Sequence, residues 1–392
     1  MMGAPHLGNS GLYGSERTAH PSENDQQKVL VMTDKRYKAR WCWILVPTLL
    51  APLIGLHRAV ADDADGLRVT DYSISHTSNE PFYAQQNLDS RVTLHVREVV
   101  LAGRERTVAE DGKVLLLIHG FSFPGYVAFD TDHENCSLMR YFARAGWDTF
   151  ALDLEGFGLS TRPLVMDAPA AFPDSKAPMH SDVTVRDVER VVDFISELRG
   201  VEQVHLLGWS QGASLEAPLY AIQHPEKVAS LVLFGVSYDN PMSLEEREKS
   251  AADGEAQKVI HSVPLLERWA RLGTKEEFVV PGCFDVHRKA LLASDPKSGE
   301  RGGAVRVPAG RAVDEDLAKP HFDAAKITAP TLVIRGDADT YAEREDNQKL
   351  MTALGSTVKE YVEIPDAGHF LHFENVNMEF YQAVQNFLEA EK

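Results

Sequence analysis

The chain has 392 residues, of which 44% are hydrophobic, 8% aromatic and 25% charged, a composition that excludes a disordered or collagen-like polymer. Its 40 Lys and Arg against 58 Asp and Glu give a net charge of −18, which argues against nucleic acid or an anionic membrane surface as the main partner. Three cysteines are too few for a disulfide scaffold.

The N-terminal part of the chain predicts a secretory signal peptide. Its apolar stretch, residues 41–56, follows a basic segment and leads to Ala59-Val60-Ala61, a small-x-small cleavage site. This stretch contains two prolines and is shorter than the ~20 residues that span a bilayer, which disfavours the alternative of an uncleaved membrane anchor. We expect Met32 to be the true start, and residues 1–61 to be an upstream extension plus a signal peptide at about 32–61. The mature chain is then secreted or periplasmic, without stable membrane insertion.

Two cysteines, Cys136 and Cys283, remain after the signal is removed. In an oxidising compartment they can form a disulfide, and the alternative is a pair of buried free thiols. The sequence does not tell whether they lie within bonding distance, so both states remain open.

From residue 91 onward, short apolar runs alternate with amphipathic segments. Residues 91–101 alternate apolar and polar side chains, which predicts a strand with one solvated face. Short apolar runs predict further strands, mostly buried on both faces, at 114–118, 149–152, 204–207, 231–234, 331–334 and 358–364. Helical spacing predicts helices at 137–145, 183–199, 212–223, 342–354 and 375–390. The alternation predicts an α/β fold with a doubly wound, mostly parallel sheet, whose site lies at the carboxyl ends of the strands.

The strand pattern stops between residues 237 and 322, where charged helical stretches are joined by Gly-, Pro- and Arg-rich pieces. Because this segment is too long for an ordinary loop, we predict an inserted, mostly helical lid over 237–322 and a core formed by 62–236 and 323–392. The alternative is a disordered linker, which the apolar residues Leu265, Leu266, Trp269 and Phe278 disfavour.

The strongest chemical motif is Gly208-Trp209-Ser210-Gln211-Gly212, directly after a predicted strand and before a predicted helix. A serine hydroxyl becomes a useful nucleophile when a sharp strand-to-helix turn holds it exposed beside a base. The two glycines fit that turn, since a side chain at either position would clash with the neighbouring elements. The free N–H groups of the helix also point at developing negative charge. We predict that Ser210 is the nucleophile.

A second motif, His119-Gly120-Phe121, ends another buried strand. A carbonyl that becomes tetrahedral needs two N–H donors near its oxygen, and we predict the backbone amides of Phe121 and Gln211 as this oxyanion hole. Ser122 is a weaker contender for the second donor. His119 is more plausibly a brace of its loop than a base.

The base and its partner are predicted from two later motifs. His369 follows Gly368 in the loop after the last strand, and we favour it over His372, which is expected to cap or pack the closing helix. In Arg335-Gly336-Asp337-Ala338-Asp339 either acid can accept the imidazole N–H, and the spacing after Gly336 favours Asp339. Asp337 would then brace the turn, and Asp239 is a remote third choice.

These elements occur in the chain order Ser, Asp, His, each at the carboxyl end of a predicted strand, and in this the chain resembles the α/β-hydrolase superfamily over residues 90–390 apart from the lid. Residues 153–160 are similar to the D-x-x-G-x-G-x-S turn of the family, with Glu155 where many members have Arg or Pro. The resemblance implies a structural role for this turn at the floor of the site.

We therefore expect a serine hydrolase that cleaves a carboxylic ester or similar acyl bond of a small molecule. The same three residues serve amidases or aminopeptidases, C–C bond hydrolases and perhydrolases, and a non-catalytic ligand-binding protein is the alternative from another class. Trp209, Ser122 and Trp269 are candidate substrate contacts. The chain has no P-loop, no dinucleotide fingerprint, no H-E-x-x-H and no paired C-x-x-C, so we expect neither cofactor nor metal. The sequence gives no oligomeric state.

Overall fold

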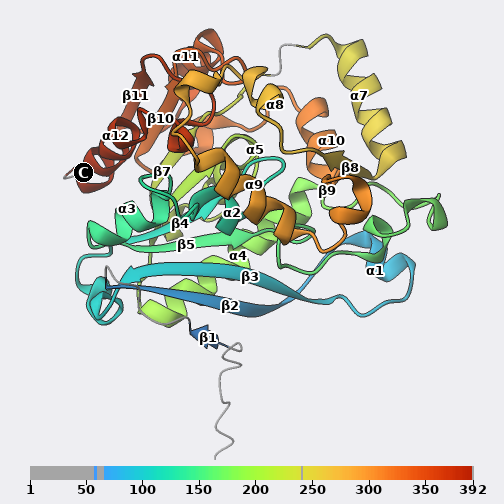
Figure 1. The fold of residues 1–392 in the computed structure, drawn as a ribbon, viewed down its shortest axis with the longest axis horizontal. Coiled ribbons are helices and arrows are strands. Elements are labelled where there is room, and N and C mark those ends of the chain that lie inside the picture. Colours follow the sequence, from blue (N-terminus) through green and yellow to red (C-terminus); the bar gives the residue numbers. More distant parts are fainter. Residues whose placement is uncertain (1–56, 60–65, 240–241, 391–392) are drawn as a thin grey trace, which may run out of the picture. The chain divides into compact units, whose positions relative to one another are not determined.

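The computed structural model describes residues 57–59, 66–239 and 242–390 (Figure 1). The predicted signal peptide at about 32–61 therefore lies outside the described residues, except for His57–Ala59. These three residues form strand β1, which pairs with β2 (Leu67–Thr77) in an antiparallel ladder.

A nine-stranded sheet forms the centre of the described chain, in the order β1-β2-β3-β5-β4-β6-β7-β10-β11. The strands not yet given are β3 (Arg91–Leu101), β4 (Val114–Ile118), β5 (Asp148–Asp153), β6 (Val204–Trp209), β7 (Val228–Phe234), β10 (Thr331–Gly336) and β11 (Lys359–Ile364). The pairs from β5 to β11 are parallel, while β1, β2, β3 and β5 pair antiparallel. This arrangement confirms the predicted doubly wound, mostly parallel sheet.

Burial explains why the apolar runs identified these strands. Every residue of β4 is buried, as is every residue of β10, because helices cover both faces of a parallel sheet. Strand β2 was not predicted. Its inward positions include the polar residues Thr70 and His76, so the apolar alternation that marks β3 is incomplete there.

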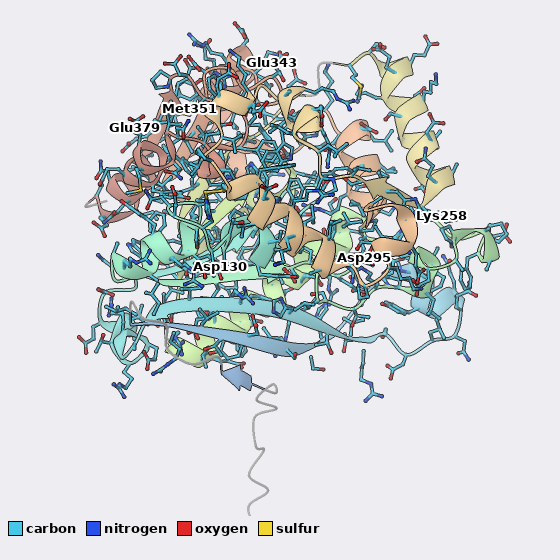
Figure 2. The ribbon with its side chains drawn as sticks, viewed as in Figure 1. Asp130, Lys258, Asp295, Glu343, Met351 and Glu379 are labelled. Atoms are coloured by element: carbon cyan, nitrogen blue, oxygen red, sulfur yellow. A yellow bond between two sulfur atoms is a disulfide. The ribbon has the colours of Figure 1, made fainter. Side chains whose placement is uncertain are left out.

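The predicted helices are present with shifts at their ends. They are α3 (Leu138–Arg144), α4 (Ser181–Arg199), α11 (Arg344–Ala353) and α12 (Asn377–Glu389), while the helix predicted at 212–223 is divided into α5 (Gln211–Ser214) and α6 (Glu216–Gln223). The short helices α1 (Pro81–Gln85) and α2 (Gly125–Phe129) were not predicted. Side chains fill the space between these elements and the sheet (Figure 2). Within the described ranges, no helix is long and apolar enough to cross a membrane.

The segment between β7 and β10 contains helices and one small sheet (yellow to orange in Figure 1). Its elements are α7 (Leu244–Gln257), β8 (Val259–Ser262), α8 (Leu266–Ala270), α9 (Cys283–Ser294), β9 (Val305–Pro308) and α10 (Gly310–Leu317). The sequence predicted a mostly helical segment here and no particular strand. Strands β8 and β9 pair antiparallel, but each has four residues, which is too short a run to show a period.

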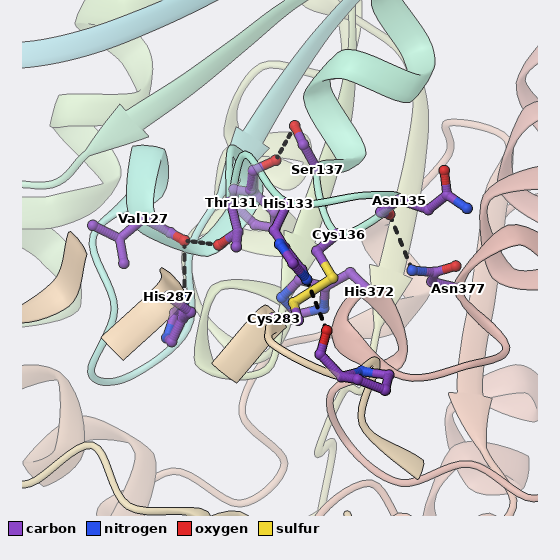
Figure 3. Close-up of a disulfide and its surroundings, with 12 residues drawn as sticks. Val127, Thr131, His133, Asn135, Cys136, Ser137, Cys283, His287, His372 and Asn377 are labelled. Carbon is purple, nitrogen blue, oxygen red and sulfur yellow. Dashed lines mark hydrogen bonds between the residues drawn. A yellow bond between two sulfur atoms is a disulfide. The ribbon is translucent and has the colours of Figure 1, made fainter. Parts of the chain in front are cut away.

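Cys136 and Cys283 form a disulfide, with a Cα–Cα distance of 6.3 Å (Figure 3). Cys136 lies just before α3, and Cys283 is the first residue of α9, so the bond ties the inserted segment to the core. Both side chains are buried. Beside them, the His133 Nε2–H group donates to the carbonyl oxygen of Pro281, 2.7 Å away. Of the two states left open by the sequence, the structure contains the disulfide.

We expect the double variant Cys136→Ser/Cys283→Ser to lose about 3 kcal/mol of unfolding free energy, because the bond closes a loop of 147 residues and restricts the unfolded chain. Thermal unfolding with and without dithiothreitol measures the effect. The reductant should lower the Tm of the wild type and leave that of the double variant unchanged. An equal response of both proteins would contradict the disulfide.

Candidate active site

Ser210 occupies a strained turn between β6 and α5, with φ of 55° and ψ of −122°. A residue other than glycine adopts a positive φ only where its surroundings impose it, and here the neighbouring glycines make that possible. A Cβ added at Gly208 would lie 2.6 Å from the Gly212 carbonyl oxygen, and one at Gly212 would lie 2.6 Å from the carbonyl oxygens of Ile118 and His119. The turn therefore packs directly against the end of β4.

Three side chains from different parts of the chain meet at this turn. The Ser210 hydroxyl lies 2.8 Å from Nε2 of His369, and Nδ1 of His369 lies 2.7 Å from Oδ2 of Asp339. The side chains of His369 and Asp339 are 1% and 0% exposed. With this order of contacts, the imidazole can take the hydroxyl proton as the oxygen attacks an electrophile, while the carboxylate fixes the tautomer.

Backbone contacts hold the Asp–His pair in position. Oδ1 of Asp339 accepts the N–H groups of Tyr341 and Ala342 at 2.9 and 3.0 Å, so only Oδ2 is left for the imidazole. The indole N–H of Trp209 donates to the carbonyl oxygen of His369 at 3.1 Å. The Tyr341 ring packs edge-on against His369, with centroids 5.0 Å apart. The histidine ring therefore cannot turn away from Ser210 without breaking several contacts.

The competing sequence candidates have other places. Asp337 accepts the N–H of Ala367 at 3.2 Å and so braces the turn, as expected. His372 is buried among the aromatic side chains of Trp209 and Phe373. Asp239 accepts a hydrogen bond from Lys349 Nζ at 3.2 Å, and the carboxylate that pairs with His369 is that of Asp339.

The predicted oxyanion donors, Phe121 and Gln211, lie beside Ser210. A Cβ added at Gly120 would lie 2.9 Å from the Ser210 Cβ, so the loop that contains Phe121 touches the turn. Gln211 is the first residue of α5, where a backbone N–H has no partner within its helix. Both residues line the cavity that contains Ser210.

His119 braces this loop. Its Nδ1–H donates to the Gly120 carbonyl oxygen at 2.7 Å, and its Nε2 accepts the Leu154 N–H at 3.3 Å. Burial, with the charge of Arg311 as a further cause, lowers the pKa of His119 to about 3, so the ring is neutral and has no free nitrogen for base chemistry.

The cavity at Ser210 has a volume of about 340 Å³ and charged groups of both signs. Its lining residues are Phe121, Ser210, Gln211, Arg268, Arg271, Leu272, Ala312, Glu315, Asp316 and Tyr341. All four charged ones come from the inserted segment. The Gln211 side-chain amide donates to Glu315 at 2.9 Å, and the Tyr341 hydroxyl donates to the same carboxylate. Burial raises the pKa of Glu315.

Arg268 has only neutral partners. Its guanidinium donates to the Ser122 hydroxyl at 2.5 Å and to the Ser262 hydroxyl, and it lies 5.7 Å from the centre of the Phe123 ring. Burial lowers the pKa of Arg268 to about 10. Within the described part of the chain, no ion pair includes Arg268 or Arg271. The cavity therefore contains cationic groups without an acidic partner.

Two predicted substrate contacts lie in the hydrophobic core instead of the cavity. Trp209 is 1% exposed and stacks near Phe123, and Trp269 is 0% exposed and stacks on Phe370 at 4.2 Å. Large aromatic side chains contribute strongly to a hydrophobic core, and Trp209 and Trp269 are part of the core that supports the site. The third, Ser122, is also buried and reaches the cavity only through its contact with Arg268.

The sequence did not identify Arg268, Arg311, Glu315 or Tyr341 as site residues. The first three lie in the inserted segment, on the short helices α8 and α10. Tyr341 follows Asp339 by two residues, which is the one sequence signal that pointed toward it.

The turn at residues 153–160 is held by hydrogen bonds around Asp153, and none of its residues lines the cavity at Ser210. Oδ2 of Asp153 accepts His95 Nδ1–H at 2.8 Å and the Leu159 N–H at 3.0 Å, and Gly158 leaves no space for a Cβ beside this carboxylate. Glu155 is buried, accepts the Tyr83 hydroxyl at 2.6 Å, and has a pKa raised to about 7 by burial. Within residues 57–59, 66–239 and 242–390, no group of His, Cys, Asp or Glu is arranged to hold a metal ion.

The model of the alpha/beta hydrolase fold family matches residues 113–376. Among curated proteins, the chain is 33% identical over 141 residues to a 2-hydroxymuconate semialdehyde hydrolase of Pseudomonas sp. (strain CF600), a match that covers 36% of this chain and 42% of that protein. The chain thus spans less than half the length of this curated relative.

Two solved structures show the same fold. An esterase from Exiguobacterium antarcticum aligns with a TM-score of 0.55 at 14% identity, over 81% of this chain and 99% of that chain. A hydrolase from Pseudomonas aeruginosa PA01 aligns with a TM-score of 0.54 at 18% identity, over 81% and 98%. At these identities the likeness concerns the fold alone.

Proposed function

The chain belongs to the alpha/beta hydrolase fold family, and we propose that it is a serine hydrolase that cleaves a carboxylic ester or similar acyl bond through an acyl-enzyme. The observation that supports this proposal is the unbroken series of hydrogen bonds from Ser210 through His369 to Asp339 beside an accessible cavity. A non-catalytic ligand-binding protein on this scaffold would require a broken series or a sealed cavity.

In the proposed reaction, the Ser210 oxygen bonds to the carbonyl carbon while its proton passes to Nε2 of His369. The carbonyl oxygen becomes negative and accepts the backbone N–H groups of Phe121 and Gln211. As the tetrahedral centre collapses, His369 gives the proton to the leaving group and the acyl-enzyme remains. His369 then takes a proton from water, whose oxygen attacks the acyl carbon. As the acyl group leaves, His369 returns this proton to the Ser210 oxygen, which restores the hydroxyl. Asp339 stabilises the imidazolium at both stages.

A second candidate reaction is the hydrolysis of a carbon–carbon bond next to a carbonyl group. The curated relative is a 2-hydroxymuconate semialdehyde hydrolase. In the described part of this chain, Arg268 and Arg271 line the cavity at Ser210 without an acidic partner. A substrate carboxylate would neutralise these cations. Either reaction starts from the same nucleophile, so the bond cleaved and the charge of the substrate are separate questions.

The first prediction is that Ser210→Ala abolishes hydrolysis of p-nitrophenyl butyrate, with kcat reduced by about 10⁴-fold or more, because it removes the hydroxyl that lies at His369 Nε2. A fluorophosphonate probe should label the wild type and not this variant, whatever the natural substrate is. The matched control is Ser230→Ala. Ser230 is a buried serine on β7 whose hydroxyl is hydrogen-bonded to His205, and the variant should keep both activities. Equal labelling of wild type and Ser210→Ala would overturn the proposal.

The second prediction concerns substrate charge. Arg268→Gln should lower kcat/KM for the p-nitrophenyl monoester of succinic acid by about 10-fold or more, the scale of one hydrogen bond to a charged group, and change that for p-nitrophenyl butyrate by less than about 3-fold. Arg288→Gln, an exposed arginine on α9 away from the cavity, is the control. An equal loss of kcat/KM for both esters would mean that Arg268 has a structural role and does not recognise the negative charge of the substrate.

We further propose that the protein is secreted or periplasmic. The Cys136–Cys283 disulfide supports an oxidising compartment, and the basic, apolar and small-residue order before residue 62 is that of a signal peptide. N-terminal sequencing of protein collected outside the cytoplasm should find Asp62 at the start. Cleavage there would remove β1, an edge strand, and leave β2 onward intact. Protein found only in the cytoplasm with residues 32–61 retained would contradict this localisation.

A further inference from the structure

We propose that helix α10 of the inserted segment positions the oxyanion hole, with Arg311 as the positioning residue that orients and polarises the peptide group between Gly120 and Phe121. This inference rests on the proposed function and adds a residue from outside the hydrolase core to its machinery. Arg311 touches neither Ser210 nor the cavity, so it acts through the backbone of the loop after β4.

The guanidinium of Arg311 joins two elements of the core. Its Nη1 donates to the Gly120 carbonyl oxygen and its Nη2 to the His119 carbonyl oxygen, both at 3.2 Å. On its other side it makes a two-point contact with Glu216 of α6, with Nε–Oε1 at 2.6 Å and Nη2–Oε2 at 2.7 Å. Both side chains are 0% exposed. One planar group thus links the loop after β4 to α6, the second helix after Ser210.

The geometry of the peptide bond makes this contact relevant to catalysis. The Gly120 carbonyl and the Phe121 N–H belong to one planar trans peptide unit and point in opposite directions. Whatever fixes the oxygen therefore fixes the direction of the N–H. The oxygen receives two donors, Arg311 Nη1 and His119 Nδ1, at 3.2 and 2.7 Å. Hydrogen bonds to a carbonyl polarise its peptide, so the Phe121 N–H becomes a stronger donor.

The cost of burying this ion pair indicates a role beyond stability. Two charges removed from water lose solvation free energy that their mutual attraction only partly restores. Apolar residues of similar volume often give a protein equal or greater stability. The Glu216 carboxylate is further satisfied by the Thr184 hydroxyl at 2.7 Å. A lysine at this position could neutralise Glu216. Its compact ammonium group, however, lacks the spread of N–H donors that lets the planar guanidinium reach two carbonyl oxygens and a carboxylate at once. The contacts use the shape of arginine as well as its charge.

Helix α10 is itself held at a fixed place on the core. A Cβ added at Gly310 would lie 2.5 Å from the Pro178 carbonyl oxygen, so this helix end packs directly on the segment before α4. Asp314, one turn later, pairs with His180 Nδ1 at 2.7 Å. Glu315 accepts the side-chain amide of Gln211, whose backbone N–H is the other proposed oxyanion donor. The helix therefore contacts Gln211 and the carbonyl end of the Gly120–Phe121 peptide unit.

The experiment compares Arg311→Met and Arg311→Lys with the wild type. We expect Arg311→Met to lower kcat for p-nitrophenyl butyrate by about 10- to 100-fold with KM changed by less than about 3-fold, a smaller loss than that from removing an oxyanion donor outright. Arg311→Lys should recover part of kcat at most. The Ki of phenylboronic acid, whose serine adduct occupies the oxyanion hole, should rise in parallel with the fall in kcat/KM.

Arg306→Met is the matched control, because Arg306 is another buried arginine of the inserted segment that pairs with an acid, Asp295, but does not contact the loop after β4. It should keep kcat and the boronate Ki at a temperature where it is folded. If Arg311→Met does not fold, by circular dichroism and thermal unfolding, Arg311→Lys is the deciding variant. A folded Arg311 variant with wild-type kcat and boronate Ki would overturn the inference. A wild type that no fluorophosphonate labels would instead overturn the proposed function.

Discussion

The close approach of the β6–α5 turn to the end of β4 is the constraint on which the site depends. Ser210 adopts a positive φ, and the backbone at Gly120 and Gly212 comes near enough that no Cβ fits. Because the turn presents the hydroxyl outward, His369 can reach it from the loop after β11, and Asp339 can reach His369 from the end of β10. A site of this kind needs a stiff support, which the fully buried strands β4 and β10 supply together with β6, buried except at His205.

The inserted segment supplies the charged side chains of the cavity at Ser210. It contributes none of the residues of the Ser210–His369–Asp339 series. It does supply Arg268, Arg271 and Glu315 to the cavity wall. It also carries Arg311, whose partners are backbone carbonyls and a buried acid. The core therefore determines which kind of reaction is possible, and the segment determines the charge, size and preorganisation of the place where it occurs.

The sequence predicted the parts of this molecule that local chemistry determines. Apolar runs located β4 and β10, and the spacing of glycines around Ser210 located the turn, because each follows from packing between near neighbours in the chain. Strand β2, with polar inward residues, and the pair β8–β9, with four residues in each strand, lacked a period. Trp209 and Trp269 were assigned to the substrate, because sequence cannot tell an aromatic side chain that fills the core from one that lines a cavity. The partners of Arg311 are far away in the chain, and only the fold brings them together.

The disulfide has a consequence for how substrates enter. The inserted segment is rooted in β7 at one end and in β10 at the other, and Cys283 adds a third anchor near its middle. The Cys136–Cys283 disulfide therefore prevents the whole segment from moving away from the core as a hinged unit. In addition to the disulfide, Arg311 and Asp314 hold α10 on the core. Under the proposed function, a substrate therefore reaches Ser210 through the existing cavity, without displacement of the whole segment.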